Sequence, residues 1–329
     1  MQVLVTGGAG FISGHLAEAF PANGHNVTVL DVMDPFYDLG IKEHTLEGHR
    51  ETAIEADVDY EFVEGDVRDA DLVAELVADT DYVYHQAAKA GVRPSVEALR
   101  EYNAVNVNGT LNLLDAAHGS GIEQFVMASS SVYNGRQEYL PFSETDPTLP
   151  VSPYGILKLT AEWYAAGYHE VYDLPTVSLR YFTVYGPRMR PNIAILNFVS
   201  RCLKDESPVV YGDGTQTRDF TYIEDVLNAN RTLLSTDAAN GEAVNVGSTD
   251  NIEIRTLAAE IRDQLAPDLE LAFAERCEAD ADHTHADITK AEQLLGYASN
   301  TPSRRASENL LRGISRTVSG TNLSYWPPD

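Results

Sequence analysis

Two residues with complementary chemistry, Tyr154 and Lys158, lie four positions apart. On a helix this spacing brings both side chains to one face, so the lysine ammonium can lie beside the phenol. A nearby positive charge favours the phenolate and lowers the pKa of a phenol from its usual value near ~10. Such a pair can accept and return a proton near neutral pH.

A glycine-rich turn at the start of the chain predicts a dinucleotide site. Gly7 and Gly10 follow a short apolar run, and Asp31 ends a second such run about twenty residues later. Glycines let the backbone approach a pyrophosphate at a helix N-terminus, while the acidic residue can bind the adenosine ribose. Since a carboxylate repels a 2′-phosphate, Asp31 favours NAD. With Tyr154 and Lys158, this turn indicates a redox site in which tyrosine moves a proton and a nicotinamide moves a hydride.

The composition limits the partners of this chain. Its 329 residues include 50 acidic and 23 basic side chains, a formal net charge of −27, and five of the basic residues are lysines. Such a surface repels nucleic acid and anionic membranes, so neither is expected as a partner. No apolar run approaches the roughly 20 residues that cross a bilayer, and Met1 leads straight into the glycine turn, so we expect a cytoplasmic protein. The acidity also indicates a halophilic, high-salt cytosol; activity and melting temperature indifferent to molar salt would contradict that hypothesis.

Cysteine and histidine usage gives no indication of a metal. Cys202 and Cys277 are expected to be reduced thiols, as in most large intracellular chains. His283 and His285 lie among carboxylates without the spacing of a zinc site, and we interpret them as surface residues. The sequence therefore predicts no metal.

Strand-like runs alternate with helix-like stretches at the start of the chain and predict a Rossmann-type, doubly wound parallel sheet. Beyond about residue 187 the alternation weakens, which predicts a smaller α+β substrate lobe interleaved with the sheet. We assign 1–182 and 220–247 to the NAD-binding domain, and 183–219 and 248–329 to the nucleotide-sugar-binding lobe. Residues 34–57 are polar and acidic and are expected to form a surface excursion.

Further motifs complete a pattern that resembles one known family. In chain order they are Thr6-Gly-Gly-Ala-Gly-Phe-Ile12, Gly65-Asp66, His85-Gln-Ala-Ala88, Asn106-Val-Asn-Gly-Thr110, Ser129-Ser-Ser-Val-Tyr133, Tyr154-x-x-x-Lys158, Arg180-Tyr-Phe-Thr-Val-Tyr-Gly-Pro-Arg188, Gly214-Thr-Gln-Thr-Arg218 and Thr284-His-Ala-Asp287. As a set they resemble the extended short-chain dehydrogenase/reductases, and the last two resemble the nucleotide-sugar branch of that family. One departure is Ser13, which stands where the family has glycine and is expected to loosen the cofactor site slightly.

The resemblance implies a role for each matching residue. Tyr154 becomes the general base and acid, Lys158 binds the nicotinamide ribose and lowers the pKa of the phenol, and Ser129, or its neighbour Ser130, hydrogen-bonds the sugar hydroxyl. Phe182 joins Tyr181 at the nicotinamide, and Arg218 and Arg276 resemble the arginines that hold a UDP diphosphate. The residues implied in NAD binding are Gly7, Gly10, Phe11, Ile12, Asp31, Asp66, Val67, Ala87, Ala88, Asn106, Tyr154, Lys158 and Tyr181.

The family performs several reactions, and two of them lack their residues here. The 4,6-dehydratases place an Asp-Glu pair where this chain has Ser130 and Ser131, and UDP-glucuronate decarboxylases usually place a glutamate at Ser131. These differences disfavour dehydration and decarboxylation. The resemblance therefore favours NAD-dependent 4-epimerisation of a UDP-hexose through a 4-keto intermediate, and homodimerisation through helices near 106–117 and 157–168.

The substrate is indicated by the segment from Thr183 to Ala194, which resembles a segment of UDP-glucuronate 4-epimerases. In those enzymes the threonine and the second arginine face the sugar carboxylate, a role that passes to Thr183 and Arg190 here, with Arg93 as another carboxylate partner. UDP-glucuronate is therefore favoured as substrate. UDP-glucose/UDP-galactose 4-epimerisation is the alternative, followed by UDP-glucuronate decarboxylation or net sugar-nucleotide oxidoreduction.

Overall fold

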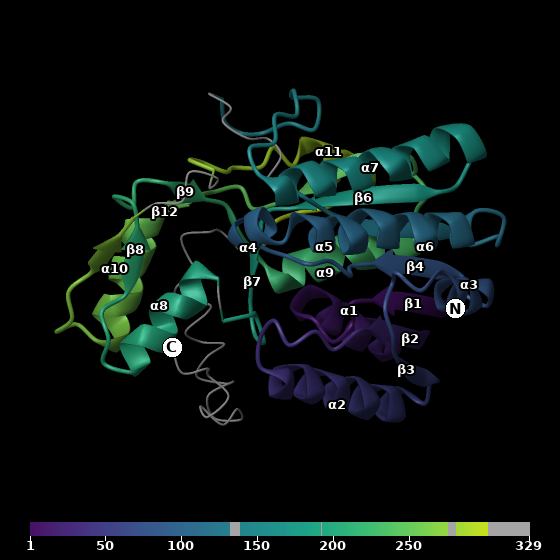
Figure 1. The fold of residues 1–329 in the computed structure, drawn as a ribbon, viewed down its shortest axis with the longest axis horizontal. Helices are drawn as coiled ribbons and strands as arrows, with labels where there is room; N and C mark the ends of the chain where they lie inside the picture. Colours follow the sequence, from purple (N-terminus) through teal and green to yellow (C-terminus); the bar gives the residue numbers. More distant parts are fainter. Residues whose placement is uncertain (132–138, 192, 276–280, 302–329) are drawn as a thin grey trace.

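The computed structural model describes residues 1–131, 139–191, 193–275 and 281–301. A seven-stranded sheet in the order β11-β6-β5-β4-β1-β2-β3 forms its centre (Figure 1). All neighbouring strands in this sheet are parallel, as a doubly wound fold requires. The strands are β1 (Gln2–Thr6), β2 (Asn26–Asp31), β3 (Tyr60–Glu64), β4 (Tyr82–His85), β5 (Gln124–Ser130), β6 (Thr176–Tyr181) and β11 (Ala243–Val246).

Helices cover both faces of the sheet. One face packs against α1 (Phe11–Ala22), α2 (Leu39–Ala56), α9 (Ile223–Thr232) and α11 (Thr289–Leu295), and the other against α3 (Ala70–Ala78), α6 (Gly109–Ala117) and α7 (Pro153–Tyr172). The connection from β4 to α6 contains α4 (Val92–Glu97), α5 (Leu99–Asn103) and the π-helical turn η1 (Ala104–Asn108), and the 3₁₀ turn η3 (Leu233–Ser235) follows α9. Among the described residues, no helix has both the length and the apolarity needed to cross a membrane.

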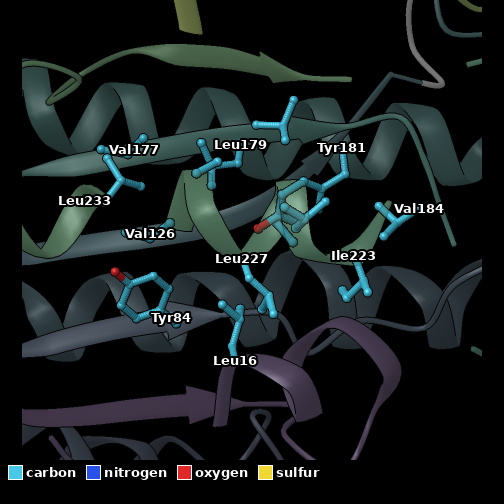
Figure 2. Packing of buried hydrophobic residues seen from close by; sticks show 14 of the residues in the cluster. Leu16, Tyr84, Val126, Val177, Leu179, Tyr181, Val184, Ile223, Leu227 and Leu233 are labelled. Atoms are coloured by element: carbon cyan, nitrogen blue, oxygen red, sulfur yellow. The ribbon is translucent and has the colours of Figure 1, made fainter. Parts of the chain in front are cut away.

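The side chains of β1 show how the two-residue period of a strand divides the core. Val3 and Val5 belong to the cluster beneath α1 and α9, whereas Leu4 belongs to the cluster beneath α3 and α6. All three are fully buried, because a central parallel strand is covered on both faces. Figure 2 shows the first cluster, in which Leu16 of α1 and Leu227 of α9 pack with residues of the strands.

A smaller lobe with its own apolar core lies beyond the carboxyl ends of the strands (Figure 1). The chain enters it through β7 (Thr183–Tyr185) and returns through β10 (Phe220–Tyr222), and these two strands pair in parallel. This entry and return confirm the predicted interleaving of lobe and sheet. The remaining elements of the lobe are α8 (Ala194–Leu203), β8 (Val209–Tyr211), β9 (Thr217–Arg218), β12 (Ile252–Glu253), α10 (Ile254–Leu265) and β13 (Ala272–Ala274), with β9 paired to β12 and β8 to β13.

Two segments differ from the sequence-based expectation. Residues 34–57 are not a surface excursion, because most of them form α2, which packs on α1 and buries Lys42, Leu46 and His49. The polar residues that hid this helix make specific bonds: His49 Nε2 donates to the Gly14 carbonyl at 2.9 Å. At the other end of the chain, α11 lies within 248–329 yet packs on the sheet face. The proposed domain boundaries place it in the lobe and stay a prediction.

Candidate active site

A cavity of about 630 Å³ lies at the carboxyl ends of the strands. Its wall combines the glycine turn, the loops after β2, β3 and β4, the end of β5, the start of α7 and the segment after β6. Arg93, Asn106 and Arg218 do not line it, and Arg276 lies outside the described residues. The predicted site residues that line it are Gly7, Gly10, Phe11, Ile12, Asp31, Asp66, Val67, Ala87, Ala88, Ser129, Ser130, Tyr154, Lys158, Tyr181, Phe182, Thr183 and Arg190.

Backbone hydrogen bonds hold the glycine turn in place. Gly7 N donates to the Leu30 carbonyl at 2.7 Å, and Gly10 N donates to the Gly7 carbonyl at 2.9 Å. Gly7 has a φ of +70°, and a Cβ at that position would lie 2.7 Å from Ala87 Cα. The Ser13 hydroxyl donates to the Gly7 carbonyl, a bond that the family's glycine could not make. Helix α1 then begins without a side-chain cap, so its N-terminus is available to an anion such as a pyrophosphate.

Asp31 is held by three donors at the next edge of the cavity. Its carboxylate accepts from Ala9 N at 3.1 Å, from Met33 N at 2.8 Å and from Lys42 Nζ at 3.1 Å. Lys42 was not predicted as a site residue, since the helix that carries it was taken for a surface excursion. Because its ammonium offsets the charge of Asp31, repulsion of a 2′-phosphate is weaker here than the sequence argument assumed.

Lysine placement was a usable signal that the sequence analysis missed. Lys42, Lys89 and Lys158 all line the cavity, although the whole chain contains five lysines. Lys89 Nζ contacts Asp34 at 3.3 Å and Glu101 at 2.6 Å on the rim. Of these three lysines, Lys158 is the one whose ammonium hydrogen-bonds a carbonyl rather than a carboxylate.

Two residues predicted to bind the cofactor, Asp66 and Asn106, hydrogen-bond protein groups in this structure. The Asp66 carboxylate binds the Arg68 guanidinium at 2.6 Å, and this bond lowers its pKa. Asn106 accepts from Lys89 N at 2.8 Å and donates to the Lys89 carbonyl at 2.9 Å. Asn106 therefore orders the loop after β4 from outside the cavity.

Tyr154 and Lys158 come from the first turns of α7, which begins at the cavity. The Ser152 hydroxyl caps this helix by accepting from Gly155 N at 3.1 Å. Tyr154 N donates to Ser95 Oγ at 3.1 Å, and Lys158 Nζ donates to the Ala128 carbonyl at 2.8 Å. Both side chains therefore line the cavity from one helical face, as their spacing predicted.

Burial controls the titration of this pair. It raises the pKa of Tyr154, and the Arg190 guanidinium is the charge that lowers it. Burial also lowers the pKa of Lys158 to about 8. The Arg190 guanidinium is thus one cation that favours the Tyr154 phenolate, and the role that the resemblance implies for Lys158 stays a prediction.

A buried ion pair holds the first of the two candidate serines. Ser129 Oγ donates to Glu162 Oε2 at 2.6 Å, and the same carboxylate accepts from Arg180 Nη2 at 2.7 Å. The Ser129 proton is therefore directed at Glu162 in this structure. Sequence analysis missed Glu162, although it lies four residues after Lys158 and so shares its helical face.

The arginines expected to contact substrate have different surroundings. Arg190 lines the cavity, and its buried Nη1 has no hydrogen-bond partner in the described part of the chain. Arg93 lies over the Tyr211 ring, 4.2 Å from the ring centroid. Arg218 donates to the carbonyls of Thr217 and Ala281, each at 2.8 Å. Of these three, Arg190 is the one that lines the cavity together with Tyr154.

Comparison with known proteins supplies the family. The NAD dependent epimerase/dehydratase family matches residues 3–247. This chain is a member of that family. A UDP-glucuronate 4-epimerase of Thermodesulfobacterium geofontis is 34% identical over 321 residues, which cover 96% of this chain and 94% of the relative.

Two solved structures of this family are similar over nearly all of the chain. The Bacillus cereus UDP-glucuronic acid 4-epimerase in complex with UDP-glucuronic acid and NAD has a TM-score of 0.89 and 32% identity, covering 96% of this chain and 100% of its own. The Thermotoga maritima UDP-glucose 4-epimerase with UDP-glucose has a TM-score of 0.87 and 28% identity, covering 97% and 100%.

Family membership confirms the predicted fold and the NAD cofactor. The cavity fits that cofactor, because the uncapped N-terminus of α1 is open to a pyrophosphate and the Gly7 turn leaves no room for a side chain. Within the described residues, no group of three or more His, Cys, Asp or Glu side chains could hold a metal ion. The roles of individual residues in the epimerase site stay predictions.

The close approach of Gly7 to Ala87 generates a test. Gly7→Ala is expected to abolish NAD binding, measured by isothermal titration, because the new Cβ displaces the loop that walls the cofactor site. Gly24→Ala is the matched control: its φ of +80° imposes the same backbone strain, but its Cβ meets nothing within 4 Å. If both variants lose NAD equally while circular dichroism shows them folded, the close approach is not the cause.

Proposed function

We propose that this epimerase-family enzyme catalyses the NAD-dependent 4-epimerisation of UDP-glucuronate. The environment of Arg190 is the observation that supports this substrate. Its buried Nη1 has no hydrogen-bond partner among the described residues, and Arg190 lines the cavity together with Tyr154. A buried donor without a partner is costly. A carboxylate on the sugar would accept from it and offset its charge.

The comparisons support the broader class, that of UDP-sugar 4-epimerases, which are isomerases. The relative from Thermodesulfobacterium and the Bacillus cereus structure favour a uronate as the sugar. The cavity has two anion-binding regions that suit a dinucleotide and a nucleotide sugar: the uncapped start of α1 and the guanidinium of Arg190.

Each residue near the sugar has a proposed task. Tyr154 accepts the proton of the sugar 4-hydroxyl and returns it after the ketone at carbon 4 has turned over. Ser129 hydrogen-bonds the oxygen of that hydroxyl, which requires its own proton to turn from Glu162 to the sugar. When bound, NAD supplies a hydride acceptor that is regenerated in each cycle. Lys158 orients the nicotinamide ribose, and Ser130 lines the same wall.

In this proposal the nucleotide end of the substrate binds to the smaller lobe. Arg218 lies there, on β9, and its guanidinium is oriented by the Thr217 and Ala281 carbonyls. Such orientation suits a diphosphate, whose oxygens accept from the N–H groups at the edge of the guanidinium plane. Arg276 is proposed as its companion and lies outside the described residues.

One observation favours UDP-glucose/UDP-galactose 4-epimerisation instead. The Arg190 guanidinium lies 6.0 Å from the centroid of the Phe36 ring, within the range of a cation–π contact. If aromatic neighbours suffice to hold Arg190, a neutral hexose would be accommodated as well. The similarity to the Thermotoga maritima enzyme is consistent with that substrate.

The substrate proposal is tested by supplying UDP-glucuronate and UDP-glucose separately, without added cofactor, and resolving the products by proton NMR. Formation of UDP-galacturonate is expected, and Arg190→Ala should lower kcat/KM for UDP-glucuronate by about 100-fold, because the substrate carboxylate is left unpaired. Arg201→Ala, which changes an arginine of α8 paired with Glu206 outside the cavity, is the control. Conversion of UDP-glucose alone would overturn the uronate proposal and leave the epimerase class intact.

The electrostatics of Tyr154 predict a pH effect. Since the Arg190 guanidinium lowers the pKa of Tyr154, Arg190→Ala is expected to raise that pKa. The phenolate is the proposed base, so the acidic limb of kcat against pH should move to higher pH. Measuring kcat at a saturating concentration of the UDP-sugar separates this effect from substrate binding. In Arg190→Lys the positive charge is kept, so the acidic limb should lie at lower pH than in Arg190→Ala. A limb that does not move in Arg190→Ala would contradict the assigned interaction.

We also propose that the protein is a homodimer. α7 exposes Ile156, Trp163 and Val171, at 51%, 62% and 67%, along one helix, and apolar patches of this kind mark interaction surfaces. Trp163→Glu is expected to convert a dimer into a monomer by light scattering at micromolar concentration. Phe273→Glu, on β13 and 59% exposed, is the control. A monomeric parent protein would contradict the proposal.

A further inference from the structure

A bidentate ion pair between Arg188 and Glu18 joins helix α1 to the loop that contains Arg190. Arg188 Nη1 donates to Glu18 Oε1 at 2.7 Å, and Arg188 Nη2 donates to Glu18 Oε2 at 2.5 Å. The side chains are 14% and 26% exposed, so solvent screens the pair little. Neither residue lines the cavity, and the substrate and cofactor roles above do not use them.

The pair is enclosed where three elements meet. Glu18 belongs to α1, Arg188 to the loop between β7 and α8, and α2 approaches so closely that a Cβ at Gly48 would lie 2.4 Å from Glu18 Oε1. His15 and His49 lie beside it, and burial lowers the pKa of each to about 4. Both imidazoles are therefore neutral at pH 7, and Arg188 is the cation that faces Glu18.

The backbone of the loop depends on this contact. Arg188 has a φ of +59°, a left-handed conformation that disfavours residues with a Cβ and persists where surrounding contacts impose it. The next residue, Met189, is buried in the core of the lobe, and Met189 N donates to the Gly186 carbonyl at 3.3 Å. Arg190 follows directly, so its place at the cavity depends on the turn that Glu18 and Met189 hold.

We propose that Glu18 and Arg188 are positioning residues that set the place of the Arg190 guanidinium and thereby select an acidic sugar. This inference rests on the proposed function, in which Arg190 binds the sugar carboxylate. Glu18 lies on the helix whose N-terminus faces the cofactor site, so one ion pair fixes the loop of the sugar site relative to the dinucleotide site. A displaced Arg190 weakens two functions at once: carboxylate binding, and the lowering of the Tyr154 pKa.

The test uses Glu18→Gln, which keeps the shape of the side chain and removes its charge. Isothermal titration should show a dissociation constant for UDP-glucuronate raised about tenfold or more, since a small displacement of a binding group is costly. The dissociation constant for UDP, which lacks the hexuronate, should be unchanged, and so should the amount of bound NAD. Glu224→Gln, which removes the partner of Arg231 on α9 in the same way, is the matched control and should alter neither constant.

A double-mutant cycle connects the pair to Arg190. In Glu18→Gln the acidic limb of kcat against pH should move to higher pH, as in Arg190→Ala, and the double variant should move no further than Arg190→Ala alone. The reversed pair, Glu18→Arg with Arg188→Glu, should restore part of the affinity for UDP-glucuronate. Additive shifts, or equal losses of UDP and UDP-glucuronate binding, would show a merely structural pair and overturn the proposal.

The two proposals fail separately. A wild-type enzyme that epimerises UDP-glucose and ignores UDP-glucuronate overturns the proposed substrate, but the pH limb can then be measured with UDP-glucose and still reports where Arg190 lies. A wild-type enzyme that epimerises UDP-glucuronate, with a limb that Glu18→Gln leaves unmoved, overturns the positioning role alone.

Discussion

The burial of charge is the constraint on which the cavity depends. A charge removed from water is costly unless an opposite charge or several hydrogen bonds offset it. Around this cavity the structure offsets Lys42 with Asp31 and Arg180 with Glu162, each at about 3 Å or less. Arg190 is different, because its buried Nη1 has no hydrogen-bond partner among the described residues. The proposed sugar carboxylate supplies that partner.

Two carboxylates behind the cavity wall hold other side chains in place. Glu162 on α7 fixes both Arg180 at the end of β6 and the hydroxyl of Ser129 at the end of β5. Glu18 fixes Arg188 at the entrance to the smaller lobe. Each pair places a side chain of the reaction relative to an element of the rigid sheet. The site therefore depends on contacts that lie behind the cavity wall as much as on the wall itself.

Because Tyr154 is buried, a neighbouring positive charge is needed to lower its pKa. A buried phenol stays protonated, since its pKa is raised, and a general base must reach its phenolate form. Arg190 supplies a positive charge within range, and in the proposed reaction it also binds the substrate carboxylate. Substrate choice and proton transfer are thereby connected through one guanidinium.

The sequence by itself determined the parallel α/β fold, the NAD cofactor and part of the cavity wall. Those features follow from local patterns: strand and helix periods, the Gly7 turn with Asp31, and the four-residue spacing of Tyr154 and Lys158. Sequence reasoning missed α2, because its buried residues include Lys42 and His49, which hydropathy counts as surface. It also did not anticipate that the Arg190 guanidinium lowers the pKa of Tyr154.

Only the tertiary structure decided which charges meet. Glu18 and Arg188 are 170 positions apart, Ser129 and Glu162 are 33 apart, and no local period brings either pair together. Their partners are set by how helices pack across the sheet and by the path of the loop after β7. A charge can be recognised from its residue type, but the cost of burying it depends on the neighbours that the fold provides.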